Sequence, residues 1–331
     1  MLFRSGMGYN RFQDFSHPKI VAPVSGATAR RGKTRHTGNT GREMYCFIVN
    51  PQANRGKAEK TARTLREILE KKEIPHAFYY TKKPGEGKEI AKSLCDRGET
   101  TIIAVGGDGT MHEVFNGIDP EKTKFGLIPC GSGNDFAATA GIPTDPEKAL
   151  ELILHGEAKP TDYMDCDGVR GLNIIGTGID VEILKRCRRI RFPKGKLQYL
   201  VSLIISLIKF KFYTFYIEED GKTETKRALI ACVGNGTRFG GGIRMCPEAV
   251  IDDGKLDFVV AGKLRKIRLP FAFAKLMKGK ILEQDFTTFY LTEHTRLDFD
   301  VPTTIQIDGE FYDDLAFDVS VVPHGALIFR A

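Results

Sequence analysis

The feature of this sequence that most constrains its fold is a glycine-rich turn, Gly106-Gly107-Asp108-Gly109-Thr110, which follows the β-branched run 101–105. That run is typical of a buried parallel strand. Glycines at the carboxyl end of such a strand let backbone N–H groups approach an anion, because no Cβ stands in the way. Thr110 is placed to cap a helix beginning at Met111, and a helix N-terminus favours a phosphate. The turn therefore predicts a nucleotide-phosphate site, with a ligand-free strand-to-helix turn as the alternative.

A second glycine-rich turn, Pro129-Cys130-Gly131-Ser132-Gly133-Asn134-Asp135-Phe136, follows the apolar run 125–128. Its two glycines allow a tight backbone path, and Ser132 offers a hydroxyl and an N–H to a phosphate. Asn134 and Asp135 are placed to cap the next helix. Alternatively, the carboxylate of Asp135 joins that of Asp108 in steering Mg²⁺ bound to a nucleotide.

From Met44 onwards, strands and helices alternate. The hydrophobic pattern predicts strands over 45–49, 77–81, 101–105 and 125–128, and helices over 58–69, over 87–95 and from 135. This alternation is typical of a parallel sheet covered on both faces, in which ligands bind at the carboxyl ends of the strands. Both glycine-rich turns lie at such ends.

After about residue 162 the pattern changes to strands separated by turn signals such as Asp220-Gly221 and Asp253-Gly254. We expect a mostly antiparallel β domain with helices near 195–210 and 268–280. Its predicted strands are 172–175, 212–217, 227–233, 256–260, 286–291, 296–299 and 304–307. The final strand candidates, 316–322 and 326–329, return to one or other of the two sheets.

The predicted organisation has three parts. Residues 1–43 form a disordered basic tail, residues 44–162 an α/β nucleotide-binding domain, and residues 163–315 a β-rich substrate domain. Residues 316–331 are candidates to complete the first domain. The tail is either a genuine basic arm or precedes the true start of translation at Met44.

Composition narrows the possible partners and location. The net charge of +7 is concentrated in residues 1–43, which carry eight Lys or Arg against Asp14 and Glu43. The remaining chain therefore gives little support for a nucleic-acid partner. The seven cysteines include no Cys-x-x-Cys pair, which favours a reducing compartment. No signal-peptide core is present, and the longest apolar stretch, 197–208, is too short to span a bilayer, so we expect a cytoplasmic protein.

The combined motifs resemble the diacylglycerol kinase catalytic family and, more narrowly, the soluble bacterial lipid kinases. The resemblance rests on both glycine-rich turns with Glu113, Val114, Asn116, Gly117 and Ala137, on Asn50-Pro51-x-Ala53-x-x-Gly56, and on Ile307-Asp308-Gly309-Glu310. It runs in order from about Met44 to the C-terminus. His112 departs from the pattern, because the family usually has Asn there.

The resemblance implies an NAD-kinase-like α/β domain joined to a β-sandwich domain, with the active site in the cleft between them. It implies ATP and Mg²⁺ as cofactors, Asp108 as a catalytic residue, and Glu310 as the general base that takes a proton from a lipid hydroxyl. The alternative for Glu310 is a solvated side chain after a hairpin turn. The implied nucleotide-site residues are Asn50, Pro51, Gln52, Ala53, Asn54, Thr81, Gly106, Gly107, Asp108, Gly109, Thr110, Met111, His112, Ser132, Asn134, Asp135 and Asp162.

The resemblance also implies a structural metal loop over residues 247–257. There Asp253 and the carbonyls of Val250 and Lys255 would hold Mg²⁺ together with water. The alternative is an ordinary Asp-Gly hairpin. The glycine-rich residues 234–242 either line the lipid entrance or form mobile loops.

A basic cluster, residues 185–196, precedes the apolar stretch 197–208. The combination suits docking to an anionic membrane surface, and a solvated loop followed by a core-covering helix is the alternative. A lipid kinase of this kind is expected to act peripherally at the inner face of a membrane, and a homodimer is plausible.

The resulting hypothesis is an ATP- and Mg²⁺-dependent kinase that phosphorylates the hydroxyl of a diacylglycerol-like lipid. The alternatives are an NAD-kinase-like enzyme for a small molecule and a catalytically inactive nucleotide-binding relative. The acceptor lipid depends on the shape of the cleft, which the sequence does not determine.

Overall fold

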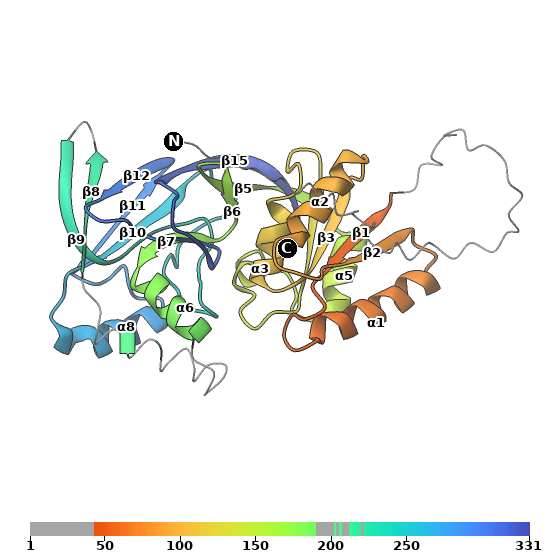
Figure 1. The fold of residues 1–331 in the computed structure, drawn as a ribbon, viewed down its shortest axis with the longest axis horizontal. Helices are drawn as coiled ribbons and strands as arrows, with labels where there is room; N and C mark the ends of the chain where they lie inside the picture. The colour runs from red at the N-terminus through yellow and green to blue at the C-terminus, as the bar shows by residue number, and fades with distance from the viewer. Residues whose placement is uncertain (1–42, 190–201, 203–204, 207–211, 220–221) are drawn as a thin grey trace, which may run out of the picture. The chain divides into compact units, whose positions relative to one another are not determined.

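The computed structural model describes residues 43–189, 202, 205–206, 212–219 and 222–331 (Figure 1). The predicted tail, apart from Glu43, lies outside the described residues. So do residues 190–196 of the basic cluster and most of the apolar stretch 197–208, with the helix predicted near 195–210. No helix among the described residues is both long and apolar enough to cross a membrane.

The first part of the fold is a parallel sheet with helices on both faces. Its strands lie in the order β2-β1-β3-β4, and β3 is buried along its whole length because helices cover it on both sides. Helices α1 and α5 contact each other on one face, and α2 and α3 on the other (Figure 1). The elements are β1 (Tyr45–Val49), α1 (Lys57–Lys71), β2 (His76–Tyr80), α2 (Glu86–Asp96), β3 (Thr101–Gly106), α3 (Asp108–Phe115), β4 (Lys124–Pro129), α4 (Asp135–Thr139) and α5 (Pro146–His155).

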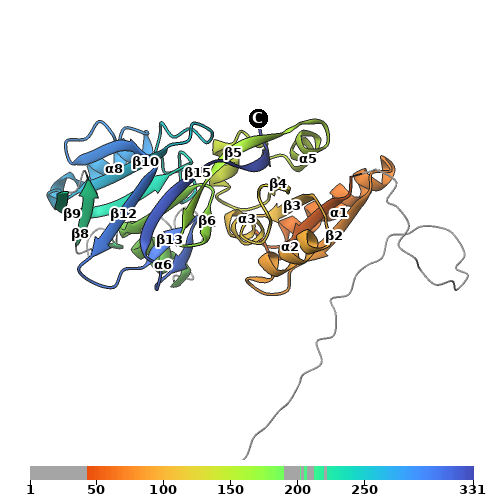
Figure 2. The same cartoon turned by 90° about the horizontal axis from the view of Figure 1, so that it is seen from above.

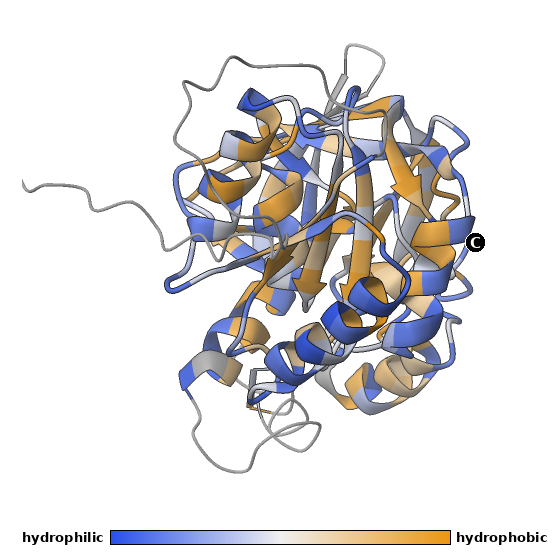
Figure 3. Ribbon diagram, turned by 90° about the vertical axis from the view of Figure 1, so that its right-hand side faces the viewer, coloured by the Kyte–Doolittle hydropathy of each residue, from blue (hydrophilic) through white to orange (hydrophobic). Residues whose placement is uncertain are grey.

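Hydrophobic periodicity explains how these helices pack. In α1 the buried side chains Ala58, Ala62, Leu65 and Leu69 recur at the spacing of a single helix face. Figure 3 shows the same division, with apolar residues concentrated on the strands and hydrophilic ones on the outer faces of the helices. The apolar stripe of each helix thus closes the core over the sheet.

The second part is built from antiparallel strands around a core that includes Phe215, Phe258 and Phe317. A further cluster of apolar side chains lies under helices α6 and α8. The elements are β6 (Val169–Gly171), β7 (Ile174–Gly178), α6 (Ile179–Arg189), β8 (Tyr213–Glu219), β9 (Lys222–Gly234), β10 (Leu256–Gly262), η1 (Lys266–Arg268), α8 (Leu269–Met277), β11 (Thr287–Thr292), β12 (His294–Phe299), β13 (Ile305–Ile307) and β14 (Glu310–Tyr312).

Two strands, β5 (Ala158–Cys166) and β15 (Phe317–Phe329), join the parts into one continuous sheet (Figure 2). Strand β15 pairs antiparallel with β12 and β5, and near its end Leu327 and Ile328 pair parallel with β4. The two strands predicted over 316–322 and 326–329 are therefore one strand, which serves both sheets. The register shift between Val322 and Ala326 marks the break that the sequence suggested. The predicted fold class is confirmed, whereas the predicted domain limits stay a prediction.

Local differences from the sequence expectations have physical causes. Helix α3 begins at Asp108 and not at Met111, because Gly107 is the extended residue that precedes the helix. Thr110 does not cap the helix; its hydroxyl accepts a hydrogen bond from Asn50 Nδ2 at 3.3 Å. Helix α5 was not expected, although its sequence carries a clear start signal: Asp145 accepts from two backbone N–H groups, and Pro146 follows it.

Candidate active site

The two glycine-rich turns lie side by side, because the strands that lead into them, β3 and β4, are neighbours with Gly106 opposite Pro129. Cys130 N donates to Gly106 O at 2.7 Å, so the backbones remain in contact past the strands. A Cβ on Gly131 would lie 2.6 Å from the Cα of Gly107, and this separation is too short for any side chain at position 131. Glycine at both positions is what lets the turns pack backbone against backbone.

Asp108 fastens the first turn to the second. Its Oδ2 accepts from Asn134 N and its Oδ1 from Asp135 N, both at 2.9 Å. Burial raises the pKa of Asp108, although these two hydrogen bonds act in the opposite direction. Asn134 precedes α4 but makes no side-chain cap. Instead its Oδ1 accepts from Gly131 N and its Nδ2 donates to Gly131 O, so its side chain braces the second turn.

Asp135 is the second buried carboxylate at the turns. Its Oδ2 accepts from Gly241 N at 2.8 Å, so the glycine-rich segment 240–242 of the β part contacts it directly. Burial, and then the charge of Asp108, raise the pKa of Asp135 to about 6. Oxygens of both carboxylates converge on Gly133, where a Cβ would lie 2.8 Å from Asp108 Oδ2 and 3.3 Å from Asp135 Oδ2. Two desolvated carboxylates with converging oxygens fit a hard cation such as Mg²⁺.

The predicted nucleotide residues gather along the carboxyl edge of the parallel sheet. Asn50 follows β1, and its side chain joins the first glycine-rich turn through Thr110. Thr81 follows β2, and its N–H donates to Val49 O at 2.9 Å. Ser132 is exposed above the second turn, whereas the side chain of Met111 is buried in the core, which leaves only its backbone for a ligand. Residues 51–54 form a turn next to Asn50.

Glu310 reaches this edge from the β part. It begins β14 after a two-residue turn in which Asp308 and Gly309 both have positive φ, 51° and 90°. The Asp308 carboxylate accepts from the N–H groups of Leu172, Asn173 and Ile174 at 2.9, 2.9 and 3.2 Å, which fixes the turn. A Cβ on Gly109 would lie 3.1 Å from Glu310 Oε1. The carboxylate of Glu310 therefore lies directly over the first glycine-rich turn.

A buried hydrogen bond ties helix α3 to the Glu310 hairpin. His112 Nε2 and the Tyr312 hydroxyl lie 2.7 Å apart, and His112 Nδ1 lies 3.5 Å from Asp308 Oδ2. Burial, followed by the charges of Glu310 and Asp308, raises the pKa of Tyr312 to about 12. The contacts of His112 thus help to hold the hairpin that carries Glu310 in place. Because the His112 side chain is buried, it is not exposed to a nucleotide.

Asp162 lies elsewhere in the fold. Its carboxylate is fully buried and accepts from Gly254 N at 2.7 Å and His324 N at 2.6 Å. These hydrogen bonds fasten the loop 247–257 to strand β15. Its predicted part in the nucleotide site stays a prediction, because its hydrogen bonds are directed to the loop and not to the glycine-rich turns.

The predicted metal loop contains an unpaired buried carboxylate. Asp253 Oδ1 accepts from Lys255 N at 2.9 Å, and Val250 is half exposed. Asp257 is buried, and within the described residues its Oδ2 has no hydrogen-bond partner. Burial, then the charges of Asp253 and Glu248, raise the pKa of Asp257 to about 7. This donor set fits a cation, but the Mg²⁺ site of Val250, Asp253 and Lys255 stays a prediction.

No three His, Cys, Asp or Glu side chains converge in a metal-binding cluster anywhere in the described part of the chain. An ion at either location would therefore need backbone carbonyls, phosphate oxygens or water to complete its coordination.

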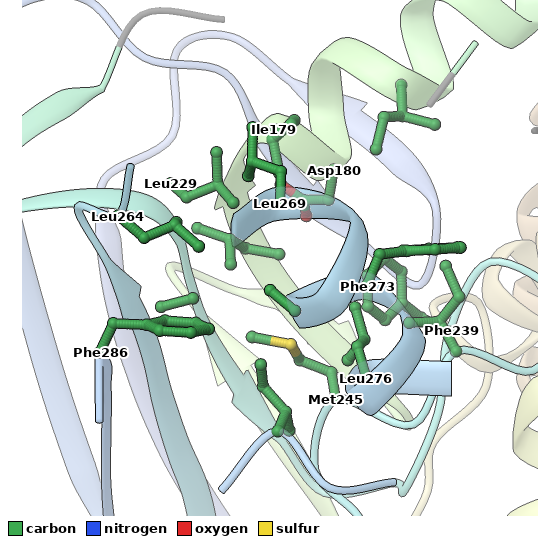
Figure 4. A pocket seen from close by; sticks show the side chains of 16 residues that line it. Ile179, Asp180, Leu229, Phe239, Met245, Leu264, Leu269, Phe273, Leu276 and Phe286 are labelled. Atoms are coloured by element: carbon green, nitrogen blue, oxygen red, sulfur yellow. The ribbon is translucent and has the colours of Figure 1, made fainter. Parts of the chain in front are cut away.

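The β part contains an apolar cavity of about 60 Å³ between α6, α8 and strands β9 and β10 (Figure 4). Leu269, Phe273 and Leu276 of α8 line the cavity together with Ile179 and Asp180 of α6. Asp180 is the single charged side chain among the residues that line it.

Asp180 is unusual because neither of its carboxyl oxygens has a hydrogen-bond partner among the described residues. Its burial raises its pKa to about 7. Gln306 Nε2, which is likewise unpaired in the described structure, lies beside it: a Cβ on Gly176 would be 2.8 Å from Asp180 Oδ2 and 3.2 Å from Gln306 Nε2. The cavity therefore has one polar end, where a hydroxyl or carbonyl group could be recognised.

Sequence reasoning did not identify Asp180, Gln306 or Tyr312. Asp180 had a usable signal, an acidic residue within the apolar run Ile179-Asp180-Val181, where an unpaired carboxylate is costly and so suggests a function. Gln306 and Tyr312 carry no such sequence signal, because only the fold brings Gln306 to Asp180 and Tyr312 to His112.

Two family models match the chain: "Diacylglycerol kinase catalytic domain" over residues 44–166 and "YegS C-terminal NAD kinase beta sandwich-like domain" over residues 173–330. A Cronobacter sakazakii protein described as "Probable lipid kinase YegS-like" is 33% identical over 80% of this chain and 89% of its own length. A Mycobacterium tuberculosis diacylglycerol kinase is 26% identical over 86% of this chain and 94% of its own length.

The solved structures agree with the sequence comparisons. A crystal structure of a diacylglycerol kinase from Bacillus anthracis superposes with a TM-score of 0.72 at 25% identity, and covers 88% of this chain and 99% of its own. The similarity therefore extends over both parts of the fold.

We expect Tyr312→Phe to destabilise the protein by about 1–3 kcal/mol, because it leaves the buried Nε2 of His112 without a partner. Urea unfolding followed by circular dichroism measures this change. The matched control is Tyr216→Phe, which removes a hydroxyl from a partly exposed ring and should alter stability by less than about 0.5 kcal/mol. Equal stability of the two variants would contradict the buried contact.

We expect Asp135→Asn to stabilise the protein without ligands above pH 6, by about 1–3 kcal/mol. The folded pKa of about 6 lies above the ordinary 3.8, so folding disfavours the ionised form. The loss of folding stability caused by ionised Asp135 is absent below about pH 4, grows as the pH rises, and reaches its full size above about pH 6. Denaturation midpoints measured at pH 4 and pH 7.5 test this prediction, which fails if the variant gains nothing at pH 7.5.

Proposed function

Since the chain belongs to the diacylglycerol kinase family of lipid kinases, we propose that it transfers the γ-phosphate of ATP to the hydroxyl of a diacylglycerol-like lipid. The observation that carries this proposal is the position of Glu310. Its carboxylate lies over Gly109, so a base faces the turn that is shaped to hold phosphates.

The glycine-rich turns would bind the phosphates of ATP through backbone N–H groups and the exposed Ser132. Phosphoryl transfer depends mainly on positioning and on neutralising charge, so a rigid backbone cradle suits it. The hydrogen bonds from Asn134 N and Asp135 N to Asp108 supply that rigidity. The loop after Asn50 would complete the nucleotide site at the end of β1.

Asp108 and Asp135 are the residues that would hold Mg²⁺ beside the phosphates, since their oxygens converge on Gly133. When bound, the ion would neutralise phosphate charge. The ionised form of Asp135, which burial disfavours, would be favoured again beside a cation.

Glu310 would act as the general base. As the lipid hydroxyl attacks the γ-phosphorus, its proton would pass to the Glu310 carboxylate, and ADP would leave on the opposite side. Tyr312 and Asp308 fix the hairpin that carries Glu310, so the base would be held in place before the lipid arrives.

The apolar cavity would receive part of the acceptor's hydrocarbon chain. Its polar end adjoins the base, because Gln306 lies on β13 and its Oε1 accepts from Gly309 N at 2.8 Å, next to Glu310. An apolar cavity suits a lipid and not the polar acceptor of an NAD kinase. The presence of Asp108, Asp135 and Glu310 together argues against an inactive relative.

We expect Glu310→Gln to lower turnover at least about 100-fold, because the amide cannot accept the proton, while ATP binding persists. Transfer of labelled phosphate to dispersed diacylglycerol, with calorimetry for ATP, measures both quantities. Glu224→Gln, at an exposed position of β9, is the matched control. Near-normal turnover in Glu310→Gln would remove Glu310 as the base. Labelling of NAD but of no lipid in a total lipid extract would overturn the proposed acceptor class.

We expect Ala272→Phe, which fills the cavity, to lower kcat/KM for long-chain diacylglycerol by about tenfold, or about 1.4 kcal/mol. The same substitution at Ala274, on the exposed face of the same helix, is the control and should leave this value within twofold of the unmodified protein's, on the order of 0.4 kcal/mol. Substrates dispersed in detergent keep membrane binding out of the comparison. Equal kinetics in the two variants would show that the cavity does not receive the acceptor.

A further inference from the structure

Helix α8 is apolar on both of its faces. Its inner face, Leu269, Phe273 and Leu276, lines the cavity (Figure 4). On the outer face the side chain of Phe271 is 74% exposed, and Ile267, in the preceding turn η1, is 78% exposed. Met277, at the end of the helix, is 47% exposed.

The apolar composition of α8 indicates that its outer face binds a partner. Eight of the nine residues of α8 are apolar, and Lys275 is the exception. Helices that are apolar all round are normally buried on every side. Large apolar side chains gathered at one exposed place typically mark an interaction surface.

The charge around α8 identifies the kind of partner. Residues 263–285 contain seven Lys or Arg against Glu283 and Asp285. Those two acids are engaged, Asp285 by Arg268 at 2.6 Å and Glu283 by Lys280 at 3.2 Å. Lys263, Arg265 and Lys278 form no ion pair with another described residue, and all three are exposed. Exposed cations therefore flank the exposed apolar side chains in the sequence, on both sides of Ile267 and Phe271.

We propose that η1 and α8, residues 263–280, form a docking surface for an anionic lipid bilayer, with Ile267 and Phe271 inserted among the lipids. Apolar side chains flanked by Lys and Arg complement a surface in which anionic headgroups cover hydrocarbon. The proposal rests on the proposed lipid-kinase function and deepens it, since α8 separates the cavity from this surface. A lipid taken from the bilayer at α8 would enter the cavity past the helix's own apolar face.

The absence of tryptophan from the chain allows a direct test. In Phe271→Trp a single indole would report the polarity at this position. Its emission should shift to the blue on adding vesicles of equal parts phosphatidylglycerol and phosphatidylcholine, and not with phosphatidylcholine alone. Val301→Trp, at an exposed apolar position outside this surface, is the control and should not respond.

Vesicle sedimentation without ATP tests the same surface by removing its apolar side chains and measuring how much vesicle binding is lost. We expect the double variant Ile267→Ser, Phe271→Ser to bind the anionic vesicles at least about tenfold more weakly than the unmodified protein, because the transfer of large apolar side chains from water into lipid is favourable. Val301→Ser should bind like the unmodified protein. Raised salt should weaken binding in every case, since the cations contribute through screened charge.

The outcomes separate the surface from the enzyme. Failure of the unmodified protein to sediment, or sedimentation without a blue shift in Phe271→Trp, overturns the assignment of this surface. A blue-shifted emission before vesicles are added also overturns it, and indicates that a second copy of the chain covers Phe271. Intact docking with no phosphoryl transfer to any lipid overturns the proposed function and leaves the docking surface standing.

Discussion

The site depends on buried carboxylates that accept backbone N–H groups from distant segments. Asp108 joins the two glycine-rich turns in this way, and Asp308 joins the Glu310 hairpin to residues 172–174. Asp162 does the same between the loop 247–257 and strand β15. An ionised acceptor makes a stronger hydrogen bond than a neutral one, so each carboxylate can fix a loop that glycine leaves conformationally free.

This arrangement has an electrostatic cost that is concentrated where chemistry is proposed. Desolvation raises the pKa of both Asp108 and Asp135, and the charge of Asp108 further disfavours ionisation of Asp135. Asp180 is likewise desolvated at the polar end of the cavity, where Gln306 is the polar side chain beside it. Perturbed carboxyl groups of this kind are typical of sites prepared for a ligand, because a ligand supplies the missing partner. The Asp135→Asn variant would therefore gain folding stability and lose the carboxylate that is proposed to hold Mg²⁺.

The sequence predicted the parts of the site whose signals are local. Strand-then-glycine patterns located both turns, and the structure adds that their strands are neighbours, which brings Gly107 against Gly131. What depends on tertiary contacts was not predictable. Thr110 is a residue type that often caps helices, but its hydroxyl accepts a hydrogen bond from Asn50, which follows strand β1. His112 had no assigned catalytic part, and only the fold shows that its ring is engaged by Tyr312, 200 residues away.

The last strand shows why the two parts of the fold act together. Because β15 pairs with both β12 and β4, the sheet that carries Glu310 and the sheet that carries the glycine-rich turns share backbone hydrogen bonds. The proposed base on one part would then stay at a fixed distance from phosphates bound on the other, without a large interface of side chains. The same connection constrains α8. Since β15 links the β part to the nucleotide site, a bilayer bound at Phe271 would favour one orientation of the proposed active site, with the cavity between membrane and base.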